Sequence, residues 1–200
     1  VLLDTLIKDE DVYAPVMEAA GISLDDAKTV FLGLLYDLSE FGLSHRLHCS
    51  KDDAKRLMQK VLGKLKGVAV WKHKAKAQAF QREYALTPTG RKVWLNLYNY
   101  QWERNAVNAP IQGGAADMTK MAFSWLHKQP NFSVTMVVHD EICASVPLDL
   151  SGAYATLIRD AWVEAGKRVI PGVPIRADVK SGENWGIKAA KPEIDEGEEE

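Results

Sequence analysis

The stretch VTMVVHDEICASV, residues 134–146, decides how the second half of the chain is interpreted. Two runs of β-branched and apolar residues flank the tip HDE (139–141), so the pattern predicts an antiparallel hairpin with strands over about 133–138 and 142–146. Tight hairpin turns favour Gly, Asn or Asp, because these residues tolerate a positive φ, and the tip contains only one of them. The tip is therefore predicted to do more than turn the chain.

Asp140 and Glu141 place two carboxylates side by side at this tip. If the flanking strands are buried, the two acids repel each other and lose solvation, which destabilises the fold unless a cation or hydrogen-bond donors compensate. Carboxylate oxygens are ligands that divalent ions such as Mg²⁺ and Mn²⁺ prefer, so the pair is a candidate metal site. The alternative is an exposed turn whose acids are merely hydrated.

Capping patterns predict helices in the first half of the chain. Ser23 and Ser50 each stand three residues before an acid, which predicts helices running to about Leu38 and about Leu65. The further expected elements are helix-compatible sequence over 68–80, a turn at 87–90, a weak extended segment at 93–98, a helical region over 100–128 interrupted near 108–110, a helix over 151–168 and a strand over 173–179. Helices predominate beside a small antiparallel sheet, so the predicted fold class is α+β.

Lys28, Leu32 and Tyr36 recur every four residues, which places an ammonium, an aliphatic chain and a phenol along one line of the first capped helix. As a functional set, they would meet an anionic group near Lys28 and a flat group beside Tyr36. The alternative is an ordinary amphipathic helix with a peripheral lysine and a half-buried tyrosine. The spacing alone does not choose between the two.

Arg104, Asn108 and Gln112 form a second series with four-residue spacing. Guanidinium and amide groups are donors of the kind that reach acceptors in a nucleic-acid groove. The alternative is structural: Asn108 would cap a helix before Ala-Pro, and Arg104 would be solvated.

Composition restricts the class of protein. The 200 residues carry a formal charge of −2, which argues against a uniformly basic nucleic-acid binder. A basic stripe over 51–76 is nevertheless present, and residues 193–200 are almost purely acidic. The two cysteines, Cys49 and Cys143, lack metal-type spacing and favour a reduced intracellular compartment. The start lacks a methionine and opens on apolar residues, which suggests an incomplete chain.

Three blocks occur in an order that resembles a known family. They are AKTVFLGLLYDLSEFGL (27–43), ERNAVNAPIQGGAADMTKMA (103–122) and VVHDEICASVP (137–147). They are similar to the fingers helix, the palm helix and the catalytic hairpin of family A DNA polymerases, with a resemblance to those of phage type. ADVKSGENWGIKA (177–189) is similar to the end of such enzymes. The resemblance covers about residues 12–185.

The resemblance implies a DNA-directed DNA polymerase that adds dNMP to a primer 3′-hydroxyl with Mg²⁺ or Mn²⁺ as cofactor. It implies that the nucleotide is bound by Lys28, at the triphosphate, by Thr29 and Leu32, and by Tyr36, which would lie by the templating base. It implies primer–template contacts by Arg104, Asn108, Gln112 and His139. Catalysis is implied at His139, Asp140 and Glu141, with Asp140 and Glu141 as metal ligands. The implied partners are primer–template DNA and a dNTP, with no membrane, in the cytoplasm of a bacterial cell or a phage-infected host.

The resemblance also implies a division into an N-terminal entry to the palm and fingers (1–20), a fingers-like region (21–100), a palm-like region (101–188) and a disordered acidic tail (189–200). Three departures stand out: Leu24 replaces the usual arginine, Leu32 an aromatic residue and Asp37 a glycine. The aspartate-tyrosine-serine run that carries a second palm carboxylate is missing, as is a thumb, so an upstream polymerase fragment is expected to supply them. The alternatives are a degenerate DNA-binding subunit and, more remotely, an unrelated metal-binding α+β domain.

Overall fold

The computed structural model describes residues 2–8, 10–130 and 132–185. The chain divides into two compact units, Val1–Gly113 and Gly114–Glu200. This division does not test the domain boundaries predicted above, which stay predictions, and the predicted tail over 189–200 lies outside the described residues.

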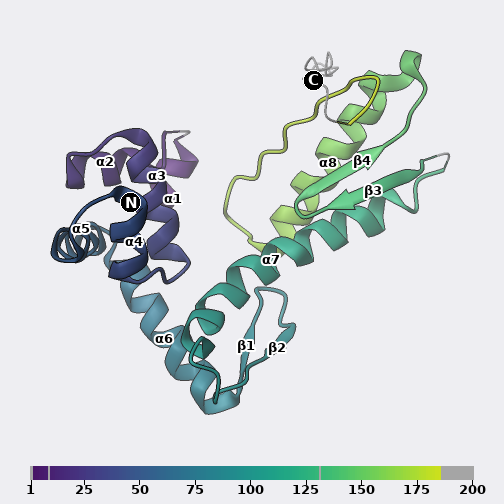
Figure 1. The fold of residues 1–200 in the computed structure, drawn as a ribbon. Coiled ribbons are helices and arrows are strands. Elements are labelled where there is room, and N and C mark those ends of the chain that lie inside the picture. The colour runs from purple at the N-terminus through teal and green to yellow at the C-terminus, as the bar shows by residue number, and fades with distance from the viewer. Residues whose placement is uncertain (1, 9, 131, 186–200) are drawn as a thin grey trace. The chain divides into compact units, whose positions relative to one another are not determined.

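The first unit is a helical array followed by a short hairpin (Figure 1). Its elements in chain order are α1 (Leu2–Ile7), α2 (Ala14–Ala20), α3 (Leu24–Leu35), α4 (Glu40–Leu47), α5 (Lys51–Lys64), α6 (Lys66–Arg82), β1 (Tyr84–Leu86), β2 (Lys92–Trp94) and the beginning of α7 (Trp102–Leu126). The core between α2, α3, α4 and α5 is built from aliphatic side chains that are almost fully buried, among them Val16, Val30, Leu34, Leu43 and Val61.

Both predicted serine caps are confirmed. The Ser23 hydroxyl accepts a hydrogen bond from the Asp26 amide at 3.2 Å, and the Ser50 hydroxyl accepts one from the Asp53 amide at 3.1 Å. Each bond satisfies one of the amides left unpaired at a helix N-terminus. Helices α1, α2 and α4 were not predicted, although Ser39 caps α4 in the same way.

Helix α3 ends earlier than predicted, at Leu35 in place of Leu38. The Leu38 amide donates to the Gly33 carbonyl at 2.8 Å, and the Asp37 amide donates to the Leu34 carbonyl at 3.4 Å. These two bonds form a Schellman motif, which ends a helix with one residue in the left-handed conformation. Asp37 is that residue, with φ of 57°, where glycine is the usual choice.

Helix α7 is continuous from Trp102 to Leu126, so the predicted interruption near 108–110 is wrong. Pro110 lies inside the helix and removes one backbone donor. Fully buried side chains on both sides of it, including Val107 and Ala122, anchor the helix in the two units, and this packing outweighs the local cost.

The predicted turn at 87–90 is confirmed and joins β1 to β2, which pair antiparallel with Ala85 opposite Val93. The Gly90 amide donates to the Thr87 carbonyl at 2.9 Å. The hairpin packs closely on α7. The approach is so close at Gly113 that an added Cβ there would lie 2.6 Å from Thr87 Cγ2.

The second unit packs a hairpin and a helix on the C-terminal part of α7. Its remaining elements are β3 (Val134–Val138), β4 (Glu141–Ala144), the short 3₁₀ helix η1 (Leu148–Leu150) and α8 (Ser151–Val169). Its buried core contains Ala122, Leu126, Phe132, Ile142, Ala161 and Ala165. The predicted strands and the helix over 151–168 are confirmed, and so is the α+β class.

The strand predicted over 173–179 is wrong. Ile175 instead lies against α8, where a Cβ added at Gly166 would be 2.3 Å from Ile175 Cγ1. Alternate residues of this segment are half-buried, which explains the strand-like pattern in the sequence. Pro174 also lacks the amide that a ladder requires.

Candidate active site

The hairpin tip is a two-residue turn. Val138 pairs with Glu141, so His139 and Asp140 form the turn and Glu141 begins β4. His139 adopts φ of 53°, a conformation that costs free energy for a residue with a Cβ. A strained histidine at a turn where Asn or Gly would fit without strain is typical of a functional position.

The three tip residues, His139, Asp140 and Glu141, are exposed. Contrary to the prediction from the sequence, the flanking strands do not desolvate the two acids, because β3 alternates between half-buried and exposed residues and Ile142 is the one buried residue of β4. The site depends on geometry and charge at an exposed tip, where a ligand can approach from solvent.

Two contacts hold the tip, and neither was predicted from the sequence. The Trp185 indole donates from Nε1 to Glu141 Oε1 at 3.1 Å, which fixes one carboxylate oxygen. The Thr119 hydroxyl, from α7, donates to the Ala115 carbonyl at 3.0 Å and lies 3.5 Å from the His139 carbonyl oxygen. Trp185 stands in the C-terminal block 177–189, whose resemblance was the available signal.

Cys143 lies on β4, two residues after Glu141. Partial burial, together with the nearby Glu141 carboxylate, raises the pKa of its thiol. The thiol is therefore a poor nucleophile at neutral pH. Cys49 and Cys143 are both free.

Within the described residues, no three Asp, Glu, His or Cys side chains gather into a metal cluster. The tip offers adjacent carboxylates at Asp140 and Glu141, and Glu141 keeps its second oxygen beside the one held by Trp185. Two oxygen ligands suit an ion such as Mg²⁺, which retains most of its water. The donor set therefore fits a weakly held divalent ion.

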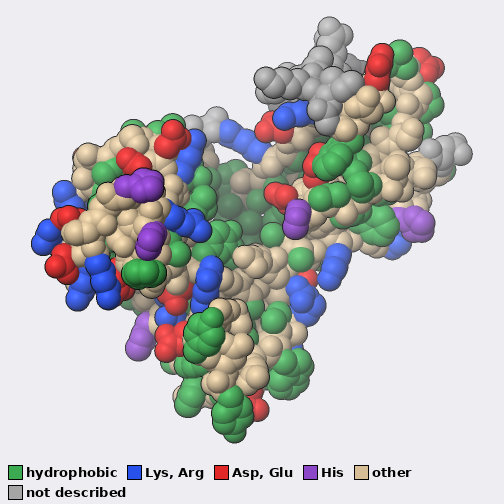
Figure 2. Space-filling model, viewed as in Figure 1, with side chains coloured by type: hydrophobic (Ala, Val, Ile, Leu, Met, Phe, Trp, Pro, Cys, Tyr) green, Lys and Arg blue, Asp and Glu red, His purple; other side chains and the backbone are tan. Residues whose placement is uncertain are grey.

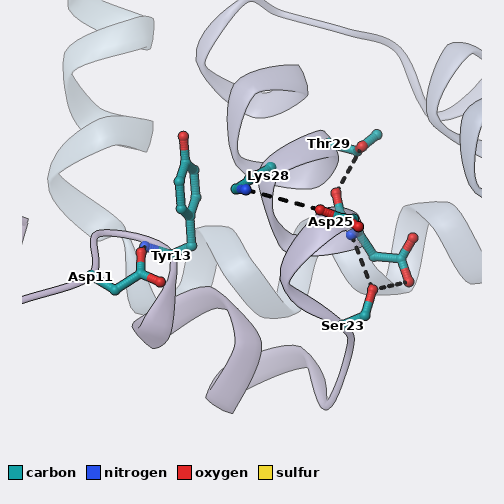
Figure 3. Close-up of polar contacts among 7 residues, drawn as sticks. Asp11, Tyr13, Ser23, Asp25, Lys28 and Thr29 are labelled. Atoms are coloured by element: carbon teal, nitrogen blue, oxygen red, sulfur yellow. Dashed lines mark hydrogen bonds and ion pairs between the residues drawn. The ribbon is translucent and has the colours of Figure 1, made fainter. Parts of the chain in front are cut away.

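The predicted nucleotide-binding residues lie on or beside α3. Lys28 is half-exposed, lies 3.9 Å from Asp25 Oδ1 and places its ammonium 5.9 Å from the centre of the Tyr13 ring (Figure 3). Thr29 donates its hydroxyl to the Asp25 carbonyl at 3.0 Å, so this hydroxyl is already partnered. The weak Asp25 ion pair leaves the Lys28 ammonium available to a stronger anion.

Leu32 and Tyr36 continue the line along α3. Leu32 is 41% exposed, although it is aliphatic. Tyr36 is the C-cap and lies one residue beyond the helix, but its amide still bonds to the Leu32 carbonyl at 2.9 Å, so the line of three persists. Leu24, the first residue of the helix and the position where the resemblance led us to expect an arginine, is 38% exposed.

The second series lies on α7. Asn108 is in the middle of this helix, so the alternative that it is a helix cap is wrong. Asn108 and Gln112 line a groove of about 390 Å³ between β2 and α7, together with Arg91 and Asn105. The Asn108 Oδ1 atom is buried and has no hydrogen-bond partner among the described residues. Arg104 is exposed and does not line this groove.

Several basic residues of the stripe over 51–76 are paired with acids. Lys51 lies 3.7 Å from Glu40, and Arg56 pairs with Asp53. Lys72 and Lys76 turn inward and pair with Asp37. Figure 2 shows basic and acidic side chains mixed over the helices of residues 14–64.

The comparisons with known proteins give the family. The family described as DNA polymerase family A matches residues 10–187. DNA polymerase I of Pseudomonas aeruginosa is 30% identical over 205 residues, which are 92% of this chain and 22% of that protein. DNA polymerase I of Chloroflexus aurantiacus is 31% identical over 170 residues, covering 80% of this chain and 18% of its own length.

Among solved structures, the POL domain of Pol1 from M. smegmatis, in complex with DNA primer-template and dNTP, superposes with a TM-score of 0.75 at 28% identity. The match covers 88% of this chain and 34% of that one. The chain belongs to DNA polymerase family A. It spans about a fifth of the length of the curated relatives it matches. No helix in its described part is long and apolar enough to cross a membrane.

Proposed function

We propose that this chain is the fingers-and-palm portion of a DNA-directed DNA polymerase, which adds dNMP to the 3′-hydroxyl of a primer on a template. The observation that carries the proposal is the tip of the β3–β4 hairpin, where a strained histidine and two exposed carboxylates meet in a family A chain. Its partners would be primer–template DNA and a dNTP, in the cytoplasm of a bacterial cell or a phage-infected host.

In this proposal Asp140 and Glu141 hold Mg²⁺ or Mn²⁺, with Trp185 orienting Glu141. A bound divalent ion would neutralise the negative charge that develops at the phosphate. His139, fixed by the turn, supports the primer terminus. The hairpin supplies one set of palm carboxylates, and an upstream polymerase segment supplies the other.

Lys28 would meet the triphosphate of the incoming dNTP, with Thr29 and Leu32 beside it. Tyr36 would lie by the templating base. Arg104, Asn108 and Gln112 would contact the primer–template. Their places on α7 support this proposal, because Asn108 and Gln112 line the groove beside β2 and Arg104 is exposed on the same helix.

A second candidate is a DNA-binding subunit that lacks the chemistry. Leu24 and Leu32 favour it, because two exposed aliphatic side chains stand where the family has an arginine and an aromatic residue. An arginine makes bidentate phosphate contacts that Lys28 alone does not replace. Both candidates require DNA binding.

The first test is binding of a fluorescent primer–template duplex, followed by anisotropy over a salt series. We expect binding that weakens steeply with salt, because neutralising phosphates releases counterions. Absence of duplex binding at low salt would contradict both candidates. It would favour the alternative of an unrelated metal-binding domain.

A further inference from the structure

Four charged residues form one network in the first unit. Lys72 and Lys76, one turn apart on α6, donate to the two oxygens of Asp37 at 2.7 and 2.8 Å. Lys76 also donates to Glu103 Oε2, in the first turn of α7, at 2.9 Å. Lys72 donates in addition to the Leu34 carbonyl at 2.7 Å. The network therefore joins the end of α3 to α6 and to the beginning of α7.

This network differs from the ordinary surface ion pairs of the chain. The side chains of Lys72 and Asp37 are only 13% and 21% exposed. Pairs such as Lys167 with Glu164 join residues three apart in one helix and are mostly exposed. A pair within one exposed helix contributes little, whereas removing one partner of a shielded pair leaves a charge without compensation.

The network also accounts for the aspartate that stands where the family has glycine. Asp37 occupies the left-handed position of the Schellman motif at the end of α3, which glycine adopts without strain. Asp tolerates this conformation better than most residues. The two ammonium groups offset the remaining strain, and Lys72 additionally binds a carbonyl at the negative end of the helix dipole.

Tyr36 directly precedes Asp37, and Arg104 directly follows Glu103. We propose that Asp37, held by Lys72 and Lys76, is a positioning residue that fixes Tyr36 at the end of α3 and couples it through Glu103 to the DNA-contacting part of α7. The coupling rests on the proposed function, whereas the fixing of Tyr36 does not. The network lets the state of α7 affect where the templating-base side chain stands.

The fixing of Tyr36 is tested by hydrogen exchange of the Asp37 and Leu38 amides, which form the Schellman bonds. Asp37→Asn keeps the size of the side chain and its tolerance of the left-handed conformation but removes the charge. Lys72→Met keeps the stem and removes the ammonium. We expect exchange to accelerate on the order of tenfold in both variants, because local opening no longer breaks ion pairs.

Lys167→Met is the matched control, since it removes an ammonium from an exposed pair at the same 2.7 Å distance. It should leave exchange at Asp37 and Leu38 unchanged. Wild-type exchange rates in both network variants, or equal acceleration in the control, would overturn the positioning role.

The coupling is tested by NMR on protein with labelled tyrosine rings. The Tyr36 ring signal is assigned as the one that disappears in Tyr36→Phe, and it is followed while primer–template duplex is added. We expect the duplex to shift this signal in the wild type. Lys76→Met should reduce the shift on the order of severalfold at saturating duplex, since the linked ion pairs are lost. Lys76→Arg, which keeps the charge and the reach, should restore it.

An equal shift in Lys76→Met and wild type would overturn the coupling. Failure of the wild-type chain to bind the duplex at all would overturn the proposed function and the coupling with it. The exchange measurement would still decide whether Asp37 fixes Tyr36.

Discussion

Asp140 and Glu141 are two exposed acids at the tip of a hairpin, and their significance depends on what they bind. Water satisfies them in the absence of an ion. Glu141 is oriented by Trp185, whereas the Asp140 side chain makes no hydrogen bond or ion pair with the described residues. Asp140 is therefore the residue whose removal should affect an ion most.

We predict that Asp140→Ala weakens divalent-ion binding at the tip severalfold, because half of the oxygen ligands are lost. Paramagnetic broadening of the His139 and Glu141 signals by Mn²⁺ measures this. In the control Asp149→Ala, which removes an exposed acid from η1, Mn²⁺ should broaden the His139 and Glu141 signals as it does in the wild type. Equal broadening in the wild type and Asp140→Ala would sink the metal assignment.

The strain at His139 gives a second prediction at this scale. His139→Gly should leave the chain as stable as the wild type or raise the free energy of unfolding by up to about 1 kcal/mol, because glycine adopts φ near 53° freely. Urea unfolding measures it. His127→Gly, at a residue without a positive φ, should bring no such gain. A large destabilisation by His139→Gly would mean that the ring, and not the backbone, dominates at this turn.

At the scale of elements, the Asp37 network ties three helices together and should make stability depend on pH. Burial alone would raise the pKa of Asp37, but hydrogen bonds from Lys72 and Lys76 hold it below its ordinary value of 3.8. The contribution of a carboxyl with a lowered pKa is present above the unfolded-state value and is lost as the pH falls through the folded-state value.

We therefore predict that Asp37→Asn lowers the free energy of unfolding at pH 7 by about 1–3 kcal/mol, a range between exposed and buried pairs. The difference from the wild type should shrink as the pH falls from 5 towards 2. Urea unfolding at several pH values measures both. A difference that stays constant down to pH 2 would show that the Asp37 charge contributes nothing to stability.

Helix α7 carries the predicted DNA-contacting series, and Arg104 is the exposed cation of that series. We predict that Arg104→Ala weakens binding of a primer–template duplex by about 1–3 kcal/mol and lowers its salt dependence, because one ionic contact is lost. Anisotropy at several salt concentrations measures it. Arg159→Ala on α8 is the control and should bind like the wild type. No loss in Arg104→Ala would remove Arg104 from the surface.

For the whole molecule, local patterns predicted much of the fold. Serine caps and alternating apolar residues found α3, α5 and the β3–β4 hairpin, because those signals act over a few residues. Tertiary packing decided the failures: Pro110 stays within α7, and Ile175 packs on α8 without joining a sheet. Inferring those outcomes requires knowing which distant residues lie nearby.

The same distinction between local patterns and tertiary packing applies to the candidate site. Its residues were found from their spacing and from a family resemblance, but the contacts that hold them were not. Trp185 lies 44 residues from Glu141, and Lys72 lies 35 residues from Asp37, so neither contact leaves a local pattern in the sequence. Short-range patterns selected the candidate residues, and the fold supplied the groups that contact them.

The central claim is that the hairpin tip serves polymerase chemistry, and a primer-extension assay tests it most directly. The assay has three arms. The first contains the wild-type chain alone, and the second adds a polypeptide that carries the preceding polymerase segment of a DNA polymerase I relative. The third combines that polypeptide with the Asp140→Ala variant of this chain. We predict no useful extension by the chain alone, because in the proposed function the hairpin supplies only one set of palm carboxylates and a two-metal reaction uses carboxylates from both palm strands. We predict extension in the complemented mixture, and its loss with Asp140→Ala. Extension that survives Asp140→Ala, with or without the complement, would contradict the account.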